Sequence, residues 1–146
     1  MPDITVKYKK LSPDAILPSY GTEFAAGADI YALCSEPICI DAGKTVLVHT
    51  GIALAIPDGF VGLIYARSGL ASKKGLAPAN KVGVIDSDYR GEIMVALHNH
   101  SEQAVTVEQG DRIAQLVIAP YYTAKFEESD LTDTERGVGG FGSTGK

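Results

Sequence analysis

The chain has 146 residues, of which 45% are hydrophobic and 21% are charged. This composition is typical of a globular protein with its own core, and it excludes disorder of the whole chain. No uninterrupted apolar run approaches the ~18 residues that a membrane-spanning helix needs. The first ten residues lack the basic segment followed by an apolar one that marks a secretory signal. We therefore expect a single domain that is located in the cytoplasm.

The formal net charge is −5, from 13 basic and 18 acidic residues. An acidic chain binds DNA and anionic membranes poorly, so we expect neither a nucleic acid nor a membrane as partner. A small polyanion remains a candidate ligand wherever the few cations gather. The two cysteines, Cys34 and Cys39, are too few for a disulfide scaffold, and no further cysteine or histidine pair completes a zinc site.

Short strands separated by turns make up most of the chain. Apolar runs and apolar–polar alternation predict strands at residues 4–8, 45–48, 52–56, 60–65, 92–98, 104–107 and 113–118. One short helical turn is expected from Ser68 to Lys74, with Ser68 as its N-cap and Gly75 at its end. The pattern predicts an all-β fold, a jelly-roll-like β-barrel, as one domain over residues 1–125.

The C-terminal residues 126–146 differ from the rest in composition. Residues 126–135 are acidic and polar, and five of the sixteen glycines lie in the last ten positions. Such a segment cannot build a core, so we expect a flexible arm. Phe141 lies among these glycines, where it would be useful as a lid stacked on a flat ligand. The alternative is a disordered end with an incidental phenylalanine.

Each of the four arginines lies in a segment dense in glycine, serine or aspartate: Arg67, Arg90, Arg112 and Arg136. A guanidinium fork suits phosphate oxygens, and glycine lets backbone N–H groups approach them closely. The pattern favours a phosphate ligand, and the alternative is four surface arginines beside turns. The chain contains neither a P-loop nor a dinucleotide-binding glycine motif, and it lacks the zinc deaminase signature.

Residues 85–91, which read IDSDYRG, place two carboxylates and a tyrosine after an apolar stretch. One carboxylate is a candidate general base, and the other would hold a turn or pair with Arg90. Two acidic residues in a hairpin turn are more often structural, so this motif alone assigns no function.

Five segments in this order resemble the motifs of the trimeric dUTPase family, the dUTP pyrophosphatases: AAGADI at 25–30, ARSGLA at 66–71, GVIDSDYRG at 83–91, GDRIAQL at 110–116 and the glycine-rich 136–145. The resemblance implies a jelly-roll-like β-barrel and a homotrimer in which all three chains build each active site. It also implies hydrolysis of dUTP to dUMP and pyrophosphate with Mg²⁺. Such an enzyme limits uracil incorporation into DNA and supplies dUMP for dTMP synthesis.

The resemblance further implies roles for single residues on the nucleoside side. Asp86 would be the general base that activates a water molecule for attack on the α-phosphorus. Tyr89 would lie under the deoxyribose and leave no room for a ribose 2′-hydroxyl. The uracil would be capped by Phe141 from another subunit's arm, and its edge would pair with Asn80 and the hairpin of Gly83, Val84 and Ile85.

On the phosphate side, the resemblance implies ligands from two subunits: Arg67, Ser68, Gly69 and Gln115 from one, and Arg136, Gly142 and Ser143 from the arm of another. Mg²⁺ would be bound by triphosphate oxygens and water. No direct protein ligand is expected, and Asp29 would lie in the outer shell of the ion. Asp111 and Arg112 would be structural, around the third motif and the subunit contacts.

Two positions depart from the family's pattern, with Ala28 where a tyrosine is usual and Tyr65-Ala66 where a proline is common. Both lie next to motif residues and leave the chemistry intact. The related dCTP deaminases carry a glutamate where this chain has Ala96, which makes a deaminase the weaker alternative. A nucleotide-gated regulatory protein on the same scaffold is a second alternative, and such a role is compatible with catalysis.

Overall fold

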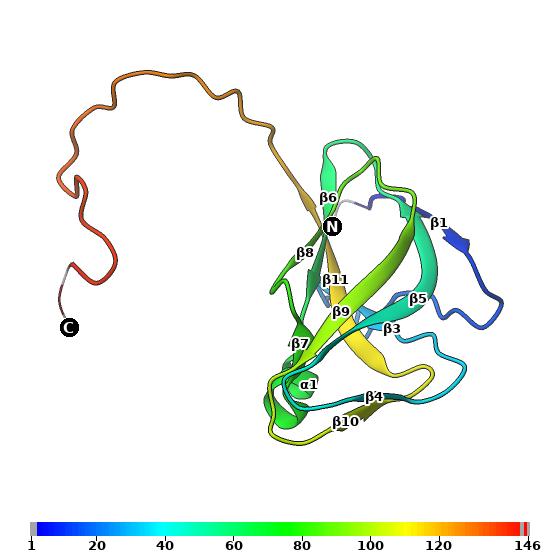
Figure 1. Cartoon of the computed structure of the whole chain (residues 1–146). Helices are drawn as coiled ribbons and strands as arrows, with labels where there is room; N and C mark the ends of the chain where they lie inside the picture. Colours follow the sequence, from blue (N-terminus) through cyan, green and yellow to red (C-terminus); the bar gives the residue numbers. More distant parts are fainter. Residues whose placement is uncertain (1–2, 144, 146) are drawn as a thin grey trace.

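The computed structural model describes residues 3–143 and residue 145, and Figure 1 shows the path of the chain. These residues form eleven strands and one short helix. In chain order the elements are β1 (Lys7–Lys10), β2 (Ser19–Tyr20), β3 (Ala28–Tyr31), β4 (Ile38–Ile40), β5 (Thr45–Ala55), β6 (Phe60–Tyr65), α1 (Ser68–Lys74), β7 (Leu76–Pro78), β8 (Gly83–Ile85), β9 (Glu92–Asn99), β10 (Val105–Val107) and β11 (Arg112–Pro120).

Three antiparallel sheets surround one apolar core. Their strand orders are β1-β5-β9-β7, β2-β3-β11-β6-β8 and β10-β4. The buried core side chains are all alanine, isoleucine, leucine or valine, and Ile40, Val48 and Leu97 are completely buried among them. The arrangement confirms the expected all-β, jelly-roll-like barrel with one short helix.

The strand β5 joins two apolar runs, 45–48 and 52–56, that the sequence predicts as separate strands. Its register against β9 is regular up to His49 and shifts before Ala53. Gly51, at this shift, has a φ of 68°, a left-handed conformation that glycine adopts without steric cost. The prediction of two strands was wrong because a β-bulge, and not a turn, separates the two runs.

The N-terminal strand begins later than predicted and is not half-buried. The strand expected at residues 4–8 is β1, and it pairs with the outer edge of β5. All four of its residues are exposed, and three of them are lysine. Lysines on an exposed edge strand oppose pairing with a second chain. The alternation in the sequence therefore reflects an edge strand and not a face of the core.

The short strands β2, β3, β4 and β7 have no predicted counterpart. They contain two to four residues each, which is too short for periodicity to reveal. The strands predicted at 60–65, 92–98, 104–107 and 113–118 are confirmed to within two residues at each end.

The helix α1 is confirmed over Ser68–Lys74, with Gly75 as its C-cap. The prediction of Ser68 as N-cap was wrong: the N-cap is Arg67, and no side chain caps the helix. Arg67 has an extended backbone, which makes Ser68 the first helical residue, and the Ser68 carbonyl accepts a hydrogen bond from Ser72 Oγ at 2.7 Å. In the described part of the chain, no helix is long and apolar enough to cross a membrane.

After β11, the described residues form no further helix or strand. The chain arcs away from the barrel as an extended arm (Figure 1). Phe126 and Phe141 are fully exposed on this arm. The division into a domain at 1–125 and a flexible arm at 126–146 stays a prediction, and regular strand pairing ends at Pro120.

Candidate functional site

The fold brings three of the sequence motifs together on one sheet. Strand β11 lies between β3 and β6. Gln115 on β11 is therefore paired with Asp29 on one side and with Tyr65 on the other. Arg67 follows two residues after Tyr65, at the end of β6. Asp29 and Gln115, which are 86 positions apart in the sequence, thus lie side by side.

The carboxylate of Asp29 organises this phosphate-side cluster. Arg67 Nε donates a hydrogen bond to Asp29 Oδ1 at 3.0 Å, and Gln115 Nε2 lies 3.5 Å from the same oxygen. The side chain of Asp29 is 9% exposed and that of Arg67 is 25% exposed. A partly desolvated ion pair of this kind fixes the direction of the guanidinium, whose Nη groups have no acceptor among the described residues.

The first turn of α1 lies next to this cluster and presents Ser68 and Gly69 to solvent. A Cβ atom added at Gly69 would meet no atom within 4 Å. The backbone there is open to a ligand, as the predicted phosphate-binding role requires. The structure thus brings together all four residues predicted to bind phosphate from the barrel: Arg67, Ser68, Gly69 and Gln115.

The predicted nucleoside-side residues of the barrel line a pocket of about 320 Å³. It lies between the β8 hairpin and the strands β5 and β9, and its lining includes Asn80, Gly83, Val84, Ile85, Asp86 and Tyr89. The hairpin is held by antiparallel pairing with β6. In the described part of the chain, none of the four phosphate-side residues lines this pocket. The two halves of the predicted site are therefore separate within one chain.

Asp86 lies directly after β8, and its side chain is exposed. No donor among the described residues binds its carboxylate, so the group is available to accept a proton from water. Of the two roles left open for the second carboxylate, holding a turn or pairing with Arg90, the structure does not show the pairing. Arg90 Nη1 instead donates to the carbonyl oxygens of Ser87 at 2.6 Å and Tyr89 at 3.1 Å. The arginine therefore holds the turn through its backbone and leaves both carboxylates free.

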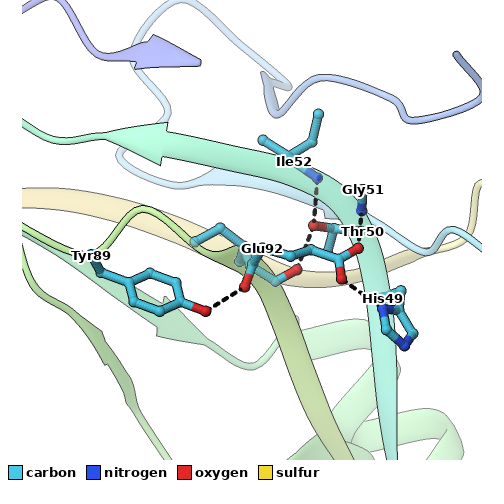
Figure 2. Close-up of polar contacts among 7 residues, drawn as sticks. His49, Thr50, Gly51, Ile52, Tyr89 and Glu92 are labelled. Carbon is cyan, nitrogen blue, oxygen red and sulfur yellow. Dashed lines mark hydrogen bonds and ion pairs between the residues drawn. The ribbon is translucent and has the colours of Figure 1, made fainter. Parts of the chain in front are cut away.

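Tyr89 is held by its own chain. Its hydroxyl donates to the backbone carbonyl of Glu92 at 2.9 Å (Figure 2). Its ring covers Gly91 so closely that a Cβ atom added there would lie 2.6 Å from Tyr89 Cζ. Glu92 also lines the pocket, and the sequence reasoning missed it. The contacts of the Glu92 side chain with His49 and Gly51 depend on the register of β5 against β9, which no local sequence signal reveals.

Among the described residues of the arm, none bonds to the phosphate-side cluster or lines the pocket. Arg136 Nε donates to the Gly139 carbonyl at 2.8 Å, within the arm itself. Phe141 is exposed, as are Gly142 and Ser143. The roles expected of these four residues stay predictions.

Asp111 and Arg112, in the fourth motif, contact the region of β3 and not the third motif among the described residues, while their expected place at subunit contacts stays a prediction. Asp111 Oδ2 accepts from the Glu108 backbone N–H at 2.8 Å, and the Asp111 carbonyl accepts from Ala32 N–H next to β3. Arg112 Nη1 lies 3.8 Å from Asp29 Oδ2. Both residues support the strand that carries Asp29.

The thiols offer no alternative nucleophile. Burial, together with the negative charges of Asp111 and Glu108, raises the pKa of the Cys34 thiol. A thiol with a raised pKa is a poor nucleophile at neutral pH. Cys39 is exposed on β4, outside the pocket lining.

Asp29 is the carboxylate of the phosphate-side cluster that could contact a Mg²⁺ ion bound to a phosphate ligand. The described residues contain no group of three or more histidine, cysteine or acidic side chains that could hold a metal. Asp29 Oδ1 is occupied by Arg67, whereas Oδ2 has only Arg112 at 3.8 Å. Mg²⁺ keeps several waters when one carboxylate and substrate phosphates bind it. Asp29 Oδ2 is therefore the oxygen that suits an outer-shell contact.

The phosphate-side cluster and the separate pocket on one jelly-roll-like barrel indicate the class of nucleotide-binding proteins. The dUTPase family model matches residues 13–145. A deoxyuridine 5'-triphosphate nucleotidohydrolase of Rickettsia felis is 52% identical over 142 residues, with 96% of each chain covered. The chain therefore belongs to the dUTPase family.

Solved structures agree with this assignment. The dUTPase of Staphylococcus bacteriophage 80alpha, solved with dUpNHpp, superposes with a TM-score of 0.88 at 29% identity, covering 97% of this chain and 99% of that one. A dUTPase from phage phi11 of S. aureus, which coordinates a structural Mg(II) ion, has a TM-score of 0.80 at 25% identity and covers 90% and 100% of the two chains.

Proposed function

We propose that this protein hydrolyses dUTP to dUMP and pyrophosphate, and so limits uracil incorporation into DNA and supplies dUMP for dTMP synthesis in the cytoplasm. The observation that supports this proposal most directly is the pocket in which Asn80, Asp86 and Tyr89 come together beside the β8 hairpin. Ala96, which also lines this pocket, carries no carboxylate, and this absence argues against the deaminase alternative.

Asp86 is the general base of the proposed reaction. Its carboxylate takes a proton from a water molecule, and the resulting hydroxide attacks the α-phosphorus. The bond from the α-phosphorus to the bridging oxygen breaks, and pyrophosphate leaves with that oxygen. Arg67 and Gln115, oriented by Asp29, stabilise the negative charge that develops on the phosphate oxygens.

Substrate choice rests on the nucleoside pocket. The β8 hairpin and Asn80 pair with the uracil edge, and the narrow hairpin excludes the thymine methyl group. Tyr89 lies under the deoxyribose and occupies the space that a 2′-hydroxyl would need. A site that hydrogen-bonds a polar edge rejects analogues lacking that edge strongly.

Mg²⁺ is the proposed cofactor, supported by the Oδ2 of Asp29, which lies 3.8 Å from Arg112 Nη1, and by the structural Mg(II) ion that the phi11 relative coordinates. Bound to triphosphate oxygens and water, it would neutralise the charge of the substrate and of the leaving pyrophosphate. Asp29 would hold one of its water ligands.

We further propose a homotrimer with shared active sites. The separation of the pocket from the phosphate-side cluster within one chain supports this proposal, because one nucleotide needs both. The arm would complete a neighbour's site: Phe141 would cap the uracil, while Arg136, Gly142 and Ser143 would bind phosphate. Sedimentation of a monomer with full activity would rule out the shared site.

Pyrophosphate release from dUTP with Mg²⁺ tests the activity, with dCTP, dTTP and UTP as controls. We expect kcat/KM for dUTP to exceed the other three values by orders of magnitude. Comparable values for UTP and dUTP would contradict the assigned role of Tyr89.

Mixing two inactive variants tests the sharing of sites. One variant carries Asp86→Asn, and the other lacks residues 136–146. When they are refolded together, an arm from the first can close on the intact Asp86 of the second. Recovered activity supports an arm that acts on a neighbour, whereas no recovery in confirmed mixed trimers indicates an arm that serves its own chain.

A further inference from the structure

We propose that Glu92 is a positioning residue, anchored across the strands by His49 and Gly51, which holds the ring of Tyr89 and thereby sets the discrimination between deoxyribose and ribose. The proposal rests on the function proposed above for the assignment of the sugar to Tyr89. The holding of the ring rests on contacts of the protein alone.

The first link is between Tyr89 and the start of β9. The Tyr89 hydroxyl donates to the Glu92 carbonyl at 2.9 Å, and the ring covers Gly91, where any Cβ atom would displace it. Tyr89 is 43% exposed, so neighbouring side chains bury only part of it. The direction of its ring therefore depends on where the Glu92 carbonyl lies.

The second link is between Glu92 and β5. Glu92 Oε1 accepts from the Gly51 backbone N–H at 2.9 Å, and Glu92 Oε2 lies 2.6 Å from His49 Nδ1 (Figure 2). A carboxylate only accepts hydrogen bonds, so the His49 proton lies on Nδ1. Both carboxylate oxygens are thus used by β5, and charge-assisted bonds of this kind are the stronger ones.

The third link makes the anchor rigid. Gly51 has its left-handed conformation at the β5 bulge, and a Cβ atom added there would lie 2.6 Å from Leu33 Cδ2 and 2.8 Å from Ala15 Cβ. The neighbouring Thr50 hydroxyl donates to the Ile93 carbonyl. The bulge is therefore packed against the core and tied to β9 at Glu92 and at the neighbouring Ile93.

The contact of Glu92 with β5 lies beside the β-bulge. The bulge interrupts the regular ladder between β5 and β9 opposite Ile93, between the pairs His49–Met94 and Ala53–Glu92. The Glu92 carboxylate adds two contacts to β5 beside this bulge, next to the Ala53–Glu92 pairing and the Thr50–Ile93 bond. Without the carboxylate, the Glu92 carbonyl would be held less firmly at the point where the turn that carries Tyr89 joins the sheet.

The test compares variants of the full-length protein. Glu92→Ala removes both anchors and His49→Ala removes one. Glu92→Gln keeps an acceptor for Gly51, and its amide can donate to His49 in the other tautomer of the ring. The matched control is His98→Ala, because His98 Nδ1 also makes a polar side-chain contact between β5 and β9, with Thr45 Oγ1 at 2.8 Å, far along the ladder from Tyr89.

Two readouts are measured. The first is the ratio of kcat/KM for dUTP to that for UTP, which we expect Glu92→Ala to lower by about fivefold, the factor of roughly one hydrogen bond. His49→Ala should lower it less, Glu92→Gln should restore it, and His98→Ala should leave it unchanged. The second readout is the ring signals of Tyr89 in ¹³C-tyrosine NMR spectra of the free protein, which should shift in the same order.

Each outcome decides one of the two proposals. An unchanged ratio with unchanged Tyr89 signals in Glu92→Ala overturns the positioning role, and so does an equal loss in His98→Ala. If the wild-type protein hydrolyses no dUTP, the proposed function fails, while the Tyr89 signals still decide the positioning role. If Glu92→Ala does not fold, His49→Ala decides it, because the His49 side chain is 57% exposed and its removal leaves the core intact.

Discussion

The proposed site residues of the barrel are held in place by neighbouring residues, whereas those of the arm are not. In the barrel, Arg67 is held by the nearly buried Asp29, and Tyr89 is held by Glu92. In the arm, the side chain of Arg136 bonds only to the arm's own backbone, and Phe141 lies fully in solvent. The barrel part of the proposed site is organised by the protein itself, whereas the proposed arm part would have to be organised by the ligand.

This difference has an energetic consequence. Ordering a chain segment costs roughly 1–2 kcal/mol of backbone entropy per residue. Strand pairing and burial offset that cost for the barrel during folding. For the arm in the proposed role, stacking on the base and contacts to phosphate would have to offset it at each binding event. Binding energy would then be used to close the site, to exclude water and to complete the phosphate contacts.

The largest effect is expected for Asp86→Asn. The amide is nearly isosteric but cannot take the proton, so kcat should fall by roughly 10²–10⁴-fold while the fold and nucleotide binding persist. Pyrophosphate release and dUTP-analogue binding are measured together. Asp88→Asn, in the same turn, is the control and should reduce kcat much less. If Asp86→Asn turns over dUTP near the wild-type rate, Asp86 is not the general base.

Stability should separate the two regions. Leu97→Ala removes a side chain that is completely buried in the barrel, and it should lower the free energy of unfolding by about 2–5 kcal/mol. Leu131→Ala, in the arm, removes a side chain that is 92% exposed and should change it by less than about 0.5 kcal/mol. Urea denaturation of both variants measures this contrast, and equal losses would show that the arm packs on the barrel in solution.

Deletion of residues 136–146 should lower kcat/KM by about 10²-fold, because the phosphate contacts and the exclusion of water are lost. The oligomeric state and melting temperature should stay near those of the full chain, since the arm contributes no core. Kinetics, sedimentation and calorimetry check the three properties. A truncated protein with normal kinetics would mean that the arm takes no part in catalysis.

The smallest effect is expected for Phe141→Ala, which removes the proposed base-stacking ring and keeps the rest of the arm. Stacking on a base is worth about 1–3 kcal/mol, so KM for dUTP should rise by roughly tenfold. Phe126→Ala is the matched control, because Phe126 is also fully exposed on the arm but lies outside the glycine-rich motif. An equal change in both variants would indicate a general effect of arm composition.

The candidate site residues could be named from the family resemblance, which the sequence reveals because each motif is a local segment. ARSGLA and GVIDSDYRG are contiguous, and the structure places their side chains in the phosphate-side cluster and in the pocket. The long strands β6, β9 and β11 could likewise be predicted from their alternation. What joins the motifs could not be predicted, since the pairing of Gln115 with Asp29 depends on which distant strands become neighbours.

The features that the sequence did not predict share a physical cause. The bulge at Gly51, the Glu92 contact with His49 and the backbone role of Arg90 all depend on register or turn geometry. A single apolar pattern is compatible with several registers. The N-cap was misplaced by one residue because the backbone of Arg67, and not the side chain of Ser68, decides where the helix begins.

The place of β11 within its sheet also governs when the enzyme can form. It is the last strand in the chain, yet it lies in the middle of the five-stranded sheet, between β3 and β6. Until Pro120 has been synthesised, both of those strands keep an unpaired edge, and Asp29 has no Gln115 beside it. Such long-range pairing folds slowly and exposes open edges to aggregation. A chain cut short within β11 would therefore lose the whole sheet rather than one strand of it, whereas a chain cut after β11 would keep the barrel and lose only its closing arm.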